Sequence, residues 1–380
     1  MNTPPDVVLL CWRDTRHPQG GGSETYLERV GAELSRRGMR VTYLTSSYPG
    51  ALRSEERDGM RFLRAGGRLT VYPRVLALLI AGRLGFGPMA GITPVAVVDT
   101  QNGIPFFATL VASAPTVVLV HHCHREQWPV AGRLLGRLGW FLESRVSPWV
   151  HRRNRYVTVS APSARELVEL GVDAERITVV HNGIDSIPDA IGPRQRVDRG
   201  AARLCVLSRL VPHKQVEDAL HVVADLHRAC DREVRLDVIG DGWWSSRLRS
   251  AASELGVDRI VTFHGHVPDE RKYELLADAD VHLMPSRKEG WGLAVIEAAQ
   301  MGVPTIGYRH ATGLAESIED SETGILVDGV DEMVSATRKL LDDPAERARL
   351  GANARARAQR YSWAATADGF AAIFDQPLAR

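Results

Sequence analysis

The chain contains two consecutive series in which short apolar runs, expected as strands, alternate with helical segments. The first series starts at residues 7–11 and ends at 177–180, and the second starts at 204–207 and ends at 324–326. Strands that alternate with helices favour parallel sheets with helices on both faces. The sequence therefore predicts an α/β protein made of two Rossmann-like, doubly wound domains.

A polar segment rich in proline and glycine, residues 186–200, separates the two series and is typical of a linker. We expect an N-terminal domain over 1–185 and a C-terminal domain over 201–360. Ligands of doubly wound sheets bind at the carboxyl ends of the strands. Two such domains facing each other would place the active site in the cleft between them.

Composition narrows the class of protein. A length of 380 residues is too great for one core, and a net charge of +1 gives no field that would attract nucleic acid. No apolar run reaches the length of a membrane span, and the start lacks the pattern of a signal peptide. The four scattered cysteines form no CxxC pair, which suits a reducing compartment. We expect a cytoplasmic protein.

Two glutamates in residues 287–304 mark a candidate ligand site in the second domain. Glu289 follows a buried apolar run and is expected on a loop at the carboxyl end of a strand. Glu297 is expected one turn into the next helix, whose start offers free N–H groups at Gly292 and Leu293. Phosphates could take these N–H groups while the carboxylates accept hydrogen bonds from sugar and ribose hydroxyls. A strand–loop–helix unit with two solvated glutamates is the alternative.

Two cations in the same domain match a diphosphate. Arg209 and Lys214 both lie in the loop after the strand 204–207. A departing diphosphate gains negative charge, which an arginine grips bidentately and a lysine attracts as a point charge. A pair of solvated surface cations is the alternative.

Two glycine loops follow strands. Gly21 and Gly22 precede a helix that Ser23 is expected to cap, and Gly240 and Gly242 follow a strand of the second domain. Either loop allows a ligand close to the backbone, although a plain tight turn explains the first nearly as well. Neither loop matches the dinucleotide fingerprint, which disfavours a nicotinamide dehydrogenase.

A cluster of three histidines and a cysteine, residues 121–124, follows the strand 117–120. Neighbours in an extended segment point to opposite faces, so one metal ion could not collect all four, and we predict no metal site. His121 is better interpreted as a hydroxyl-binding residue at the strand's carboxyl end, with a packed histidine as the alternative.

Residues 133–155 are rich in arginine with interleaved leucine, tryptophan and phenylalanine. Such a segment is compatible with peripheral contact to an anionic membrane, at the inner face of the cytoplasmic membrane, or with covering the acceptor groove. A helix packed on one face and solvated on the other is the interpretation we favour.

Taken together, these motifs resemble those of the family 4 glycosyltransferases, which are retaining enzymes with the GT-B fold. The resemblance rests on GGGSE, SRLVPHK, VIGDG, EGWGLAVIEAAQMGVPTIG and TGILVD, and covers most of the chain. It implies a GT-B arrangement of two facing Rossmann-like domains. It also implies that the last helix, within 361–380, packs back on the first domain.

The resemblance implies roles for the four charged residues of the second domain. Arg209 and Lys214 would hold the donor diphosphate, Glu289 would contact the transferred sugar, and Glu297 would accept from the ribose hydroxyls.

The resemblance also implies roles for uncharged positions. N–H groups near Gly292 and Leu293 would bind phosphate and sugar oxygens, and His121 would lie near the sugar ring. Gly21 and Gly22 would lie near the diphosphate and the acceptor.

The chain departs from the family pattern in three segments. In one of them, the loop 309–313 reads RHATG where a glycine-rich turn is usual, which could alter contacts to the donor sugar. Ser208 and Gln215 stand where glycines are usual, which concerns the conformation of the loop more than its charge. Gln300 and Met301 stand where alanines are usual, which should affect packing only.

We therefore expect a metal-independent, retaining hexosyltransferase without a cofactor, using a UDP- or GDP-sugar. Glu289, Arg209, Lys214 and His121 are its expected catalytic residues, and backbone groups around Val267 and the glycines 240 and 242 its expected donor contacts. The acceptor could be a glycan, a lipid-linked sugar or a small molecule. A disaccharide phosphorylase, a sugar-nucleotide epimerase and a non-catalytic nucleotide-sugar-binding subunit remain alternatives.

Overall fold

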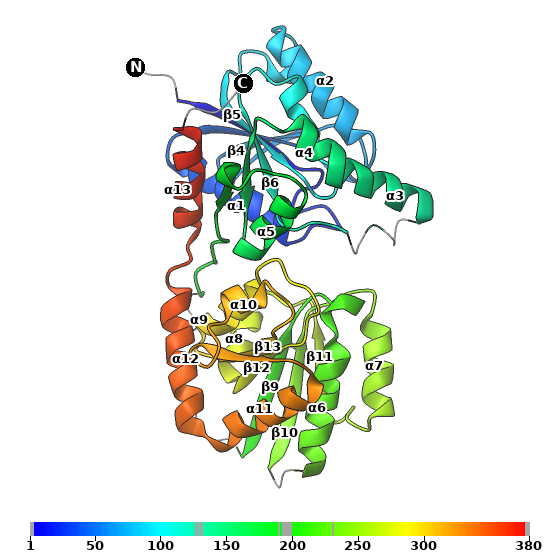
Figure 1. The fold of residues 1–380 in the computed structure, drawn as a ribbon, viewed down its shortest axis with the longest axis vertical. Coiled ribbons are helices and arrows are strands. Elements are labelled where there is room, and N and C mark those ends of the chain that lie inside the picture. Colours follow the sequence, from blue (N-terminus) through cyan, green and yellow to red (C-terminus); the bar gives the residue numbers. More distant parts are fainter. Residues whose placement is uncertain are drawn as a thin grey trace. The chain divides into compact units, whose positions relative to one another are not determined.

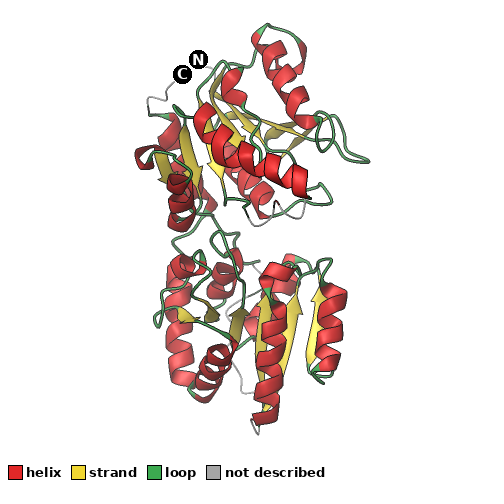
Figure 2. Cartoon of the chain, turned by 45° about the vertical axis from the view of Figure 1, so that its right-hand side comes forward, coloured by secondary structure: helices red, strands yellow, loops and turns green. Residues whose placement is uncertain are grey.

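A computed structural model describes residues 4–125, 128, 132–188, 191, 200–229 and 232–376. The chain divides into two compact units, each built around its own sheet (Figures 1 and 2). Unit 1 comprises Met1–Gly183 and Ser362–Arg380, and unit 2 comprises Ile184–Tyr361. Most of the expected linker 186–200 lies outside the described residues.

Unit 1 contains an eight-stranded sheet in the order β3-β4-β2-β1-β5-β6-β7-β8. All pairs are parallel except β3 with β4, which is antiparallel. The central strand β1 is buried along its whole length, as its continuous apolar run predicts. The strands are β1 (Asp6–Leu10), β2 (Arg40–Thr45), β3 (Ser54–Arg57), β4 (Met60–Arg64), β5 (Pro94–Thr100), β6 (Thr116–Val120), β7 (Arg155–Thr158) and β8 (Ile177–Val179).

The helices of unit 1 include one from the far end of the chain. Helix α13 packs against α1, where the ring of Tyr26 meets those of Trp363 and Phe370 at centroid distances of 6.0 and 6.1 Å. Gly183 lies so close to Trp363 that a β-carbon there would clash. The helices are α1 (Gly22–Arg36), α2 (Val71–Arg83), α3 (Arg133–Phe141), α4 (Ser147–Val150), α5 (Ala161–Glu169) and α13 (Trp363–Phe374).

Unit 2 contains a six-stranded, all-parallel sheet in the order β11-β10-β9-β12-β13-β14. Its strands are β9 (Ala201–Leu207), β10 (Glu233–Ile239), β11 (Val261–Gly265), β12 (Val281–Met284), β13 (Thr305–Tyr308) and β14 (Gly324–Val327). Its helices are α6 (Val216–Ala229), α7 (Ser245–Glu254), α8 (Asp269–Asp278), α9 (Leu293–Gln300), α10 (Leu314–Ser317), α11 (Val330–Asp342) and α12 (Pro344–Ala358).

Alternate side chains of β9 enter different hydrophobic clusters on the two faces of this sheet. Leu204 and Val206 pack with residues of α6, α7 and α11, whereas Cys205 packs with residues of α8 and α9. Helices therefore cover both faces, which is the doubly wound arrangement that the sequence predicts.

Three buried histidines make the stability of the fold depend on pH. Burial lowers the pKa of His121 and of His282 to about 3, and that of His151 to about 4. In the unfolded chain each takes up a proton near pH 6.5, so between these values the unfolded state binds more protons. Each histidine's contribution is therefore complete above pH 6.5 and lost as the pH falls, at about 1.4 kcal/mol per pH unit.

We expect the urea midpoint to fall between pH 7.5 and 5.5, and to fall less steeply in a His282→Asn variant. The exposed His266 provides the control, because its replacement by Asn should leave the pH dependence unchanged. Equal pH dependence in the wild type and in His282→Asn would contradict this prediction.

Candidate active site

The loops at the carboxyl edge of the unit 2 sheet bring the predicted donor residues to one place. Strand β9 lies between β10 and β12 in an all-parallel sheet, so the loops that follow these three strands are neighbours. The N–H of Arg287 donates to the carbonyl of His213 at 2.9 Å, which joins the loop after β12 to the loop after β9.

Lys214 and Glu289 are in direct contact. The ammonium nitrogen of Lys214 lies 2.5 Å from Oε1 of Glu289, and the two side chains are only 16% and 10% exposed. An ammonium group has three donors, so this bond leaves Lys214 able to bind a further anion. Two of the predicted catalytic residues, 75 positions apart, therefore meet.

Arg209 is exposed in the same loop. Among the interactions of the described residues, none engages its guanidinium group, so its positive charge is uncompensated. The Lys214 charge is balanced by Glu289, whereas Arg209 contributes an unbalanced positive charge to this edge.

Gly240 and Gly242 lie directly against the loop that carries Arg209. A β-carbon at Gly240 would clash with the carbonyl of Ser208, and one at Gly242 with the carbonyl of Leu210. Hydrogen bonds from Ser208 N to Ile239 O and from Leu210 N to Asp241 O, both 3.0 Å, hold the two loops together. Packing between the loops thus explains why both positions are glycine.

Gln215 adopts the left-handed conformation, with φ of 47°, that a glycine would take more easily. The turn Pro212–Lys214 ends at this residue. The loop therefore has the turn that a glycine would form, although glycine is absent. The Lys214–Glu289 ion pair and the backbone hydrogen bonds of the loop hold Gln215 in this strained conformation.

The N-terminus of α9 offers free donors beside Glu289. Gly292 precedes the helix with φ of 85°, and a β-carbon there would come within 2.9 Å of Leu314. In the described part of the chain, no hydrogen bond uses the N–H of Gly292 or Leu293. With the helix dipole behind them, these N–H groups favour an anion or a sugar oxygen.

Glu297 is paired with a lysine that sequence reasoning missed. The ammonium group of Lys272 lies 2.7 Å from Oε1 of Glu297 and 2.9 Å from Asp269. Burial raises the pKa of Glu297, and the charge of Lys272 opposes that rise without cancelling it. The sequence offered one indication that Lys272 has a role: it is one of only four lysines in the chain.

Gln300 does more than pack. Its side chain accepts from the hydroxyl of Tyr273 at 2.8 Å and donates to the carbonyl of Asp185 at 2.9 Å. The expectation that glutamine at this position affects packing only is therefore wrong. Gln300 fixes the segment that enters unit 2 to α8 and α9.

Val267 directs its side chain into the protein. It packs half-buried against the cluster that contains Ile239 and Tyr273, between Gly265 and the start of α8. Only its backbone is therefore oriented for a ligand contact.

His121 lies at the end of β6 in unit 1, with 8% of its surface exposed. Its ring meets Tyr26 edge-on at 5.0 Å, and its Nε2 has no hydrogen-bond partner among the described residues. Burial, aided by His124, lowers the pKa of His121 to about 3, so the ring is neutral at pH 7.

Nowhere in the described ranges do three or more His, Cys, Asp or Glu side chains gather as a metal ion would require.

The first glycine loop is organised by a buried carboxylate rather than by a serine cap. Helix α1 begins at Gly22, so the predicted capping by Ser23 is wrong. Glu24 accepts the N–H of Gly21 at 2.8 Å and the guanidinium of Arg13 at 3.0 Å. The glycine followed three positions later by Glu24 was the signal for this arrangement.

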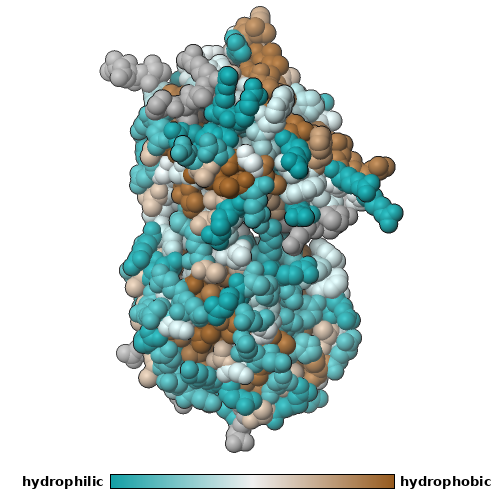
Figure 3. Space-filling view, in the orientation of Figure 1, coloured by the Kyte–Doolittle hydropathy of each residue, from teal (hydrophilic) through white to brown (hydrophobic). Residues whose placement is uncertain are grey.

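Helix α3 exposes its leucines. Leu134 is 85% exposed, whereas Gly136 and Gly139 are the buried residues of the helix. The helix is therefore packed on one face and solvated on the other, as favoured, but glycines form the packed face and leucines the solvated one. Figure 3 shows the resulting hydrophobic patch among polar side chains. The large exposed side chains of the segment are Leu134, Leu135, Leu138, Phe141 and Trp149.

None of the helices that the structure describes combines the length and the apolarity needed to cross a bilayer.

Two α/β units with largely parallel sheets are typical of the GT-B fold, and comparison with solved structures agrees. A sucrose-phosphate synthase from Thermosynechococcus elongatus superposes with a TM-score of 0.77 at 18% identity, over 97% of this chain and 98% of that one. At this identity the likeness concerns the fold alone.

Sequence comparison identifies the family. The family models "Glycosyltransferase Family 4" and "Glycosyl transferases group 1" match residues 20–186 and 191–357. A GDP-mannose-dependent alpha-(1-6)-phosphatidylinositol monomannoside mannosyltransferase of Mycolicibacterium smegmatis is 31% identical, over 88% of this chain and 89% of that protein. A D-inositol 3-phosphate glycosyltransferase of Acidothermus cellulolyticus is 33% identical over 60% and 54%. The chain belongs to the family 4 glycosyltransferases and is a nucleotide-sugar glycosyltransferase.

The close packing of the loops after β9 and β10 predicts that adding one methyl group at Gly242 weakens donor binding. In Gly242→Ala the new β-carbon meets the Leu210 carbonyl, so the loop that carries Arg209 must move. We expect nucleoside diphosphate affinity to fall on the order of tenfold, as for loss of one charge-assisted contact. Gly329→Ala is the matched control, because that position is open and extended. Unchanged affinity in a folded Gly242→Ala variant, measured by calorimetry, would refute the role given to this packing.

Proposed function

We propose that this chain is a metal-independent, retaining hexosyltransferase without a cofactor, and that GDP-mannose is the first donor to test. The observation that carries the proposal is the contact between Lys214 and Glu289 beside the uncompensated Arg209. The name of the M. smegmatis relative, which uses GDP-mannose, favours a GDP-sugar over a UDP-sugar.

The diphosphate would bind to Arg209 and Lys214. When the bond between the sugar and the diphosphate breaks, negative charge develops on the phosphate oxygens, and both cations stabilise it. N–H groups of Gly292 and Leu293 would take further phosphate or sugar oxygens at the start of α9.

The two glutamates would orient opposite ends of the donor. Oε1 of Glu289 is held by Lys214 and Oε1 of Glu297 by Lys272. In each case the second carboxylate oxygen remains to accept from a hydroxyl, on the transferred sugar for Glu289 and on the ribose for Glu297. Backbone groups at Val267 would contact the donor base.

His121 would act as a neutral hydrogen-bonding group near the sugar ring, since burial keeps its imidazole uncharged and its Nε2 has no partner among the described residues. Gly21 and Gly22 would let the diphosphate and the acceptor approach the start of α1. The acceptor hydroxyl would attack the anomeric carbon from the face that the diphosphate leaves. Attack from this face would retain the configuration at the anomeric carbon, and the proton of the hydroxyl would pass to a phosphate oxygen.

Product analysis distinguishes this proposal from other reactions on the same scaffold. A disaccharide phosphorylase would release a sugar phosphate only with inorganic phosphate, and an epimerase would need no acceptor. A non-catalytic subunit would bind the nucleotide sugar without turnover.

The activity of three variants tests the donor site. Arg209→Ala, Lys214→Ala and Glu289→Ala should each lower kcat/KM for donor turnover on the order of 10²-fold, as when donors to a developing anion are removed. Donor turnover in EDTA should equal that without it. Arg338→Ala and Lys339→Ala, exposed on α11, are the matched controls. Full activity in all three site variants would remove the basis for the proposal, and loss of activity in EDTA would exclude metal independence.

We also propose that the exposed face of α3 makes peripheral contact with an anionic membrane. Arg133 and Arg137 are exposed on α3, and Arg145 is exposed on the segment Leu142–Val146 that follows it. Both charge and apolar area promote binding to acidic lipid. This contact would place the enzyme at the inner face of the cytoplasmic membrane.

Vesicle co-sedimentation tests the membrane contact. The wild type should bind vesicles of phosphatidylcholine with phosphatidylglycerol better than phosphatidylcholine alone. A Leu134→Ser, Leu138→Ser double variant should bind on the order of tenfold more weakly, because two leucines no longer enter the lipid. Leu110→Ser, which changes a leucine elsewhere in unit 1 whose exposure (67%) lies between those of Leu134 and Leu138, is the control. Equal binding of all three proteins would contradict the contact.

A further inference from the structure

A pocket of about 560 Å³ opens in unit 1 at the carboxyl ends of β2 and β4. Carboxyl ends of parallel strands are where ligands of such sheets bind, and the volume suits a small molecule. The lining contains three arginines and no acidic residue. Its residues are Ser47, Tyr48, Pro49, Arg53, Arg64, Ala65, Gly66, Gly67, Thr70 and Arg74.

We propose that this pocket binds a phosphate ester on the acceptor of the transferase. This inference rests on the proposed function, in which unit 2 holds the donor and unit 1 receives the acceptor. It adds the chemical class of the acceptor, a phosphorylated molecule, and the residues that recognise its phosphate.

Arg64 lies at the floor of the pocket, and acidic side chains already balance its charge. The Arg64 side chain is 1% exposed and lies 2.6 Å from Asp14 and 2.8 Å from Glu55. It also donates to the carbonyl of Leu52 at 3.0 Å. Arg64 therefore holds the walls together and contributes little free charge.

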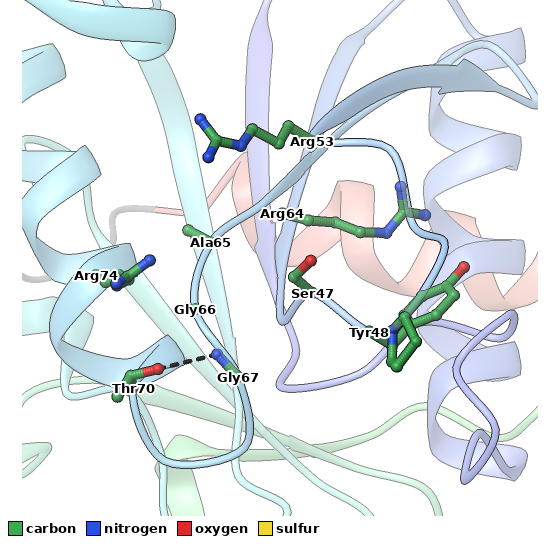
Figure 4. Close-up of a pocket in the computed structure, with 10 residues that line it drawn as sticks. Ser47, Tyr48, Arg53, Arg64, Ala65, Gly66, Gly67, Thr70 and Arg74 are labelled. Carbon is green, nitrogen blue, oxygen red and sulfur yellow. Dashed lines mark hydrogen bonds between the residues drawn. The ribbon is translucent and has the colours of Figure 1, made fainter.

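The free charge comes from Arg53 and Arg74. Both are exposed, and within the described residues neither guanidinium has a hydrogen bond or an ion pair. Figure 4 shows that they come from different elements, Arg74 from the first turn of α2 and Arg53 from the segment before β3. Two unpaired cations on separate walls of one pocket leave an uncompensated positive charge that an anionic ligand would balance.

The backbone of the pocket favours an anion as well. Helix α2 begins at Val71, so the positive end of its 13-residue dipole meets the pocket. Gly66 has φ of 75°, and a β-carbon there would lie 2.7 Å from the backbone of Thr70. The N–H of Gly67 donates to Oγ1 of Thr70 at 2.9 Å (Figure 4). Glycines in this turn keep the pocket open beside the helix start.

The arrangement fits a phosphate better than a carboxylate. Each guanidinium offers a planar fork of donors, and two forks can bind different oxygens of one tetrahedral phosphate. A carboxylate offers only two oxygens in one plane, so two forks on separate walls match it less well than they match a phosphate. The hydroxyls of Ser47 and Tyr48 remain for the polar body of the ligand.

Calorimetric titration with inorganic phosphate tests the pocket directly. Because the donor cations would also bind phosphate, the titration uses the full chain carrying Arg209→Ala and Lys214→Ala. Adding Arg53→Gln or Arg74→Gln should weaken phosphate binding on the order of tenfold each, and Arg74→Lys should restore part of it. Arg83→Gln, at the opposite end of α2, is the matched control and should change nothing. Equal phosphate affinity in all these proteins would overturn the proposal.

A second measurement distinguishes a soluble phosphate ester from a lipid headgroup. The same variants are titrated with myo-inositol 1-phosphate and mixed with phosphatidylcholine vesicles with or without phosphatidylinositol. If Arg53→Gln and Arg74→Gln weaken binding of the soluble ester but not of the vesicles, the acceptor is a free phosphate ester. If they weaken binding of the vesicles but not of the soluble ester, the acceptor is a lipid. Loss with neither probe overturns the assignment of the pocket to the acceptor.

The two proposals fail separately. Absence of donor turnover in the wild type would end the proposed function while the phosphate titration still decides the pocket. Normal turnover without phosphate binding in the pocket would end only this inference.

Discussion

The candidate site depends on the ion pair between Lys214 and Glu289. The two residues lie on loops that follow β9 and β12, and only the adjacency of these strands brings them together. Both side chains are largely shielded from water, so either charge alone would be costly to bury. The position of each loop therefore depends on that of the other. Arg209, in the same loop as Lys214, has no side-chain partner among the described residues.

Charge is distributed at the two sheet edges according to one pattern. At each edge some charged residues are neutralised inside the protein, Glu297 by Lys272 and Arg64 by Asp14, and others are left without a partner among the described residues. Neutralised residues fix the geometry, whereas unpaired cations retain affinity for an anion. Unit 2 would use the free charge of Arg209 for the donor, and unit 1 that of Arg53 and Arg74 for the acceptor.

Much of the fold could be predicted because alternating apolar runs specify local structure and burial together. Placing Glu289 on a loop and Glu297 one turn into α9 required only the strand and helix patterns. The partner of Glu297 was missed, because Lys272 comes from another helix, 25 residues away, and the scarcity of lysine does not say which residue it pairs with. Which face of α3 is packed could not be predicted either, since an amphipathic pattern does not state whether the apolar face meets protein or solvent.

The sequence by itself determined the two α/β series, the family, and which residue types stand at the carboxyl ends of the strands. Hydrophobic periodicity and turn residues encode these features locally. Only the tertiary structure decided which charges are neutralised and which stay free, and that Gly240 and Gly242 serve loop packing. It also decided that Gln215 takes a glycine's conformation. These outcomes depend on contacts between residues distant in the chain, and strand order, which the local pattern does not encode, sets those contacts.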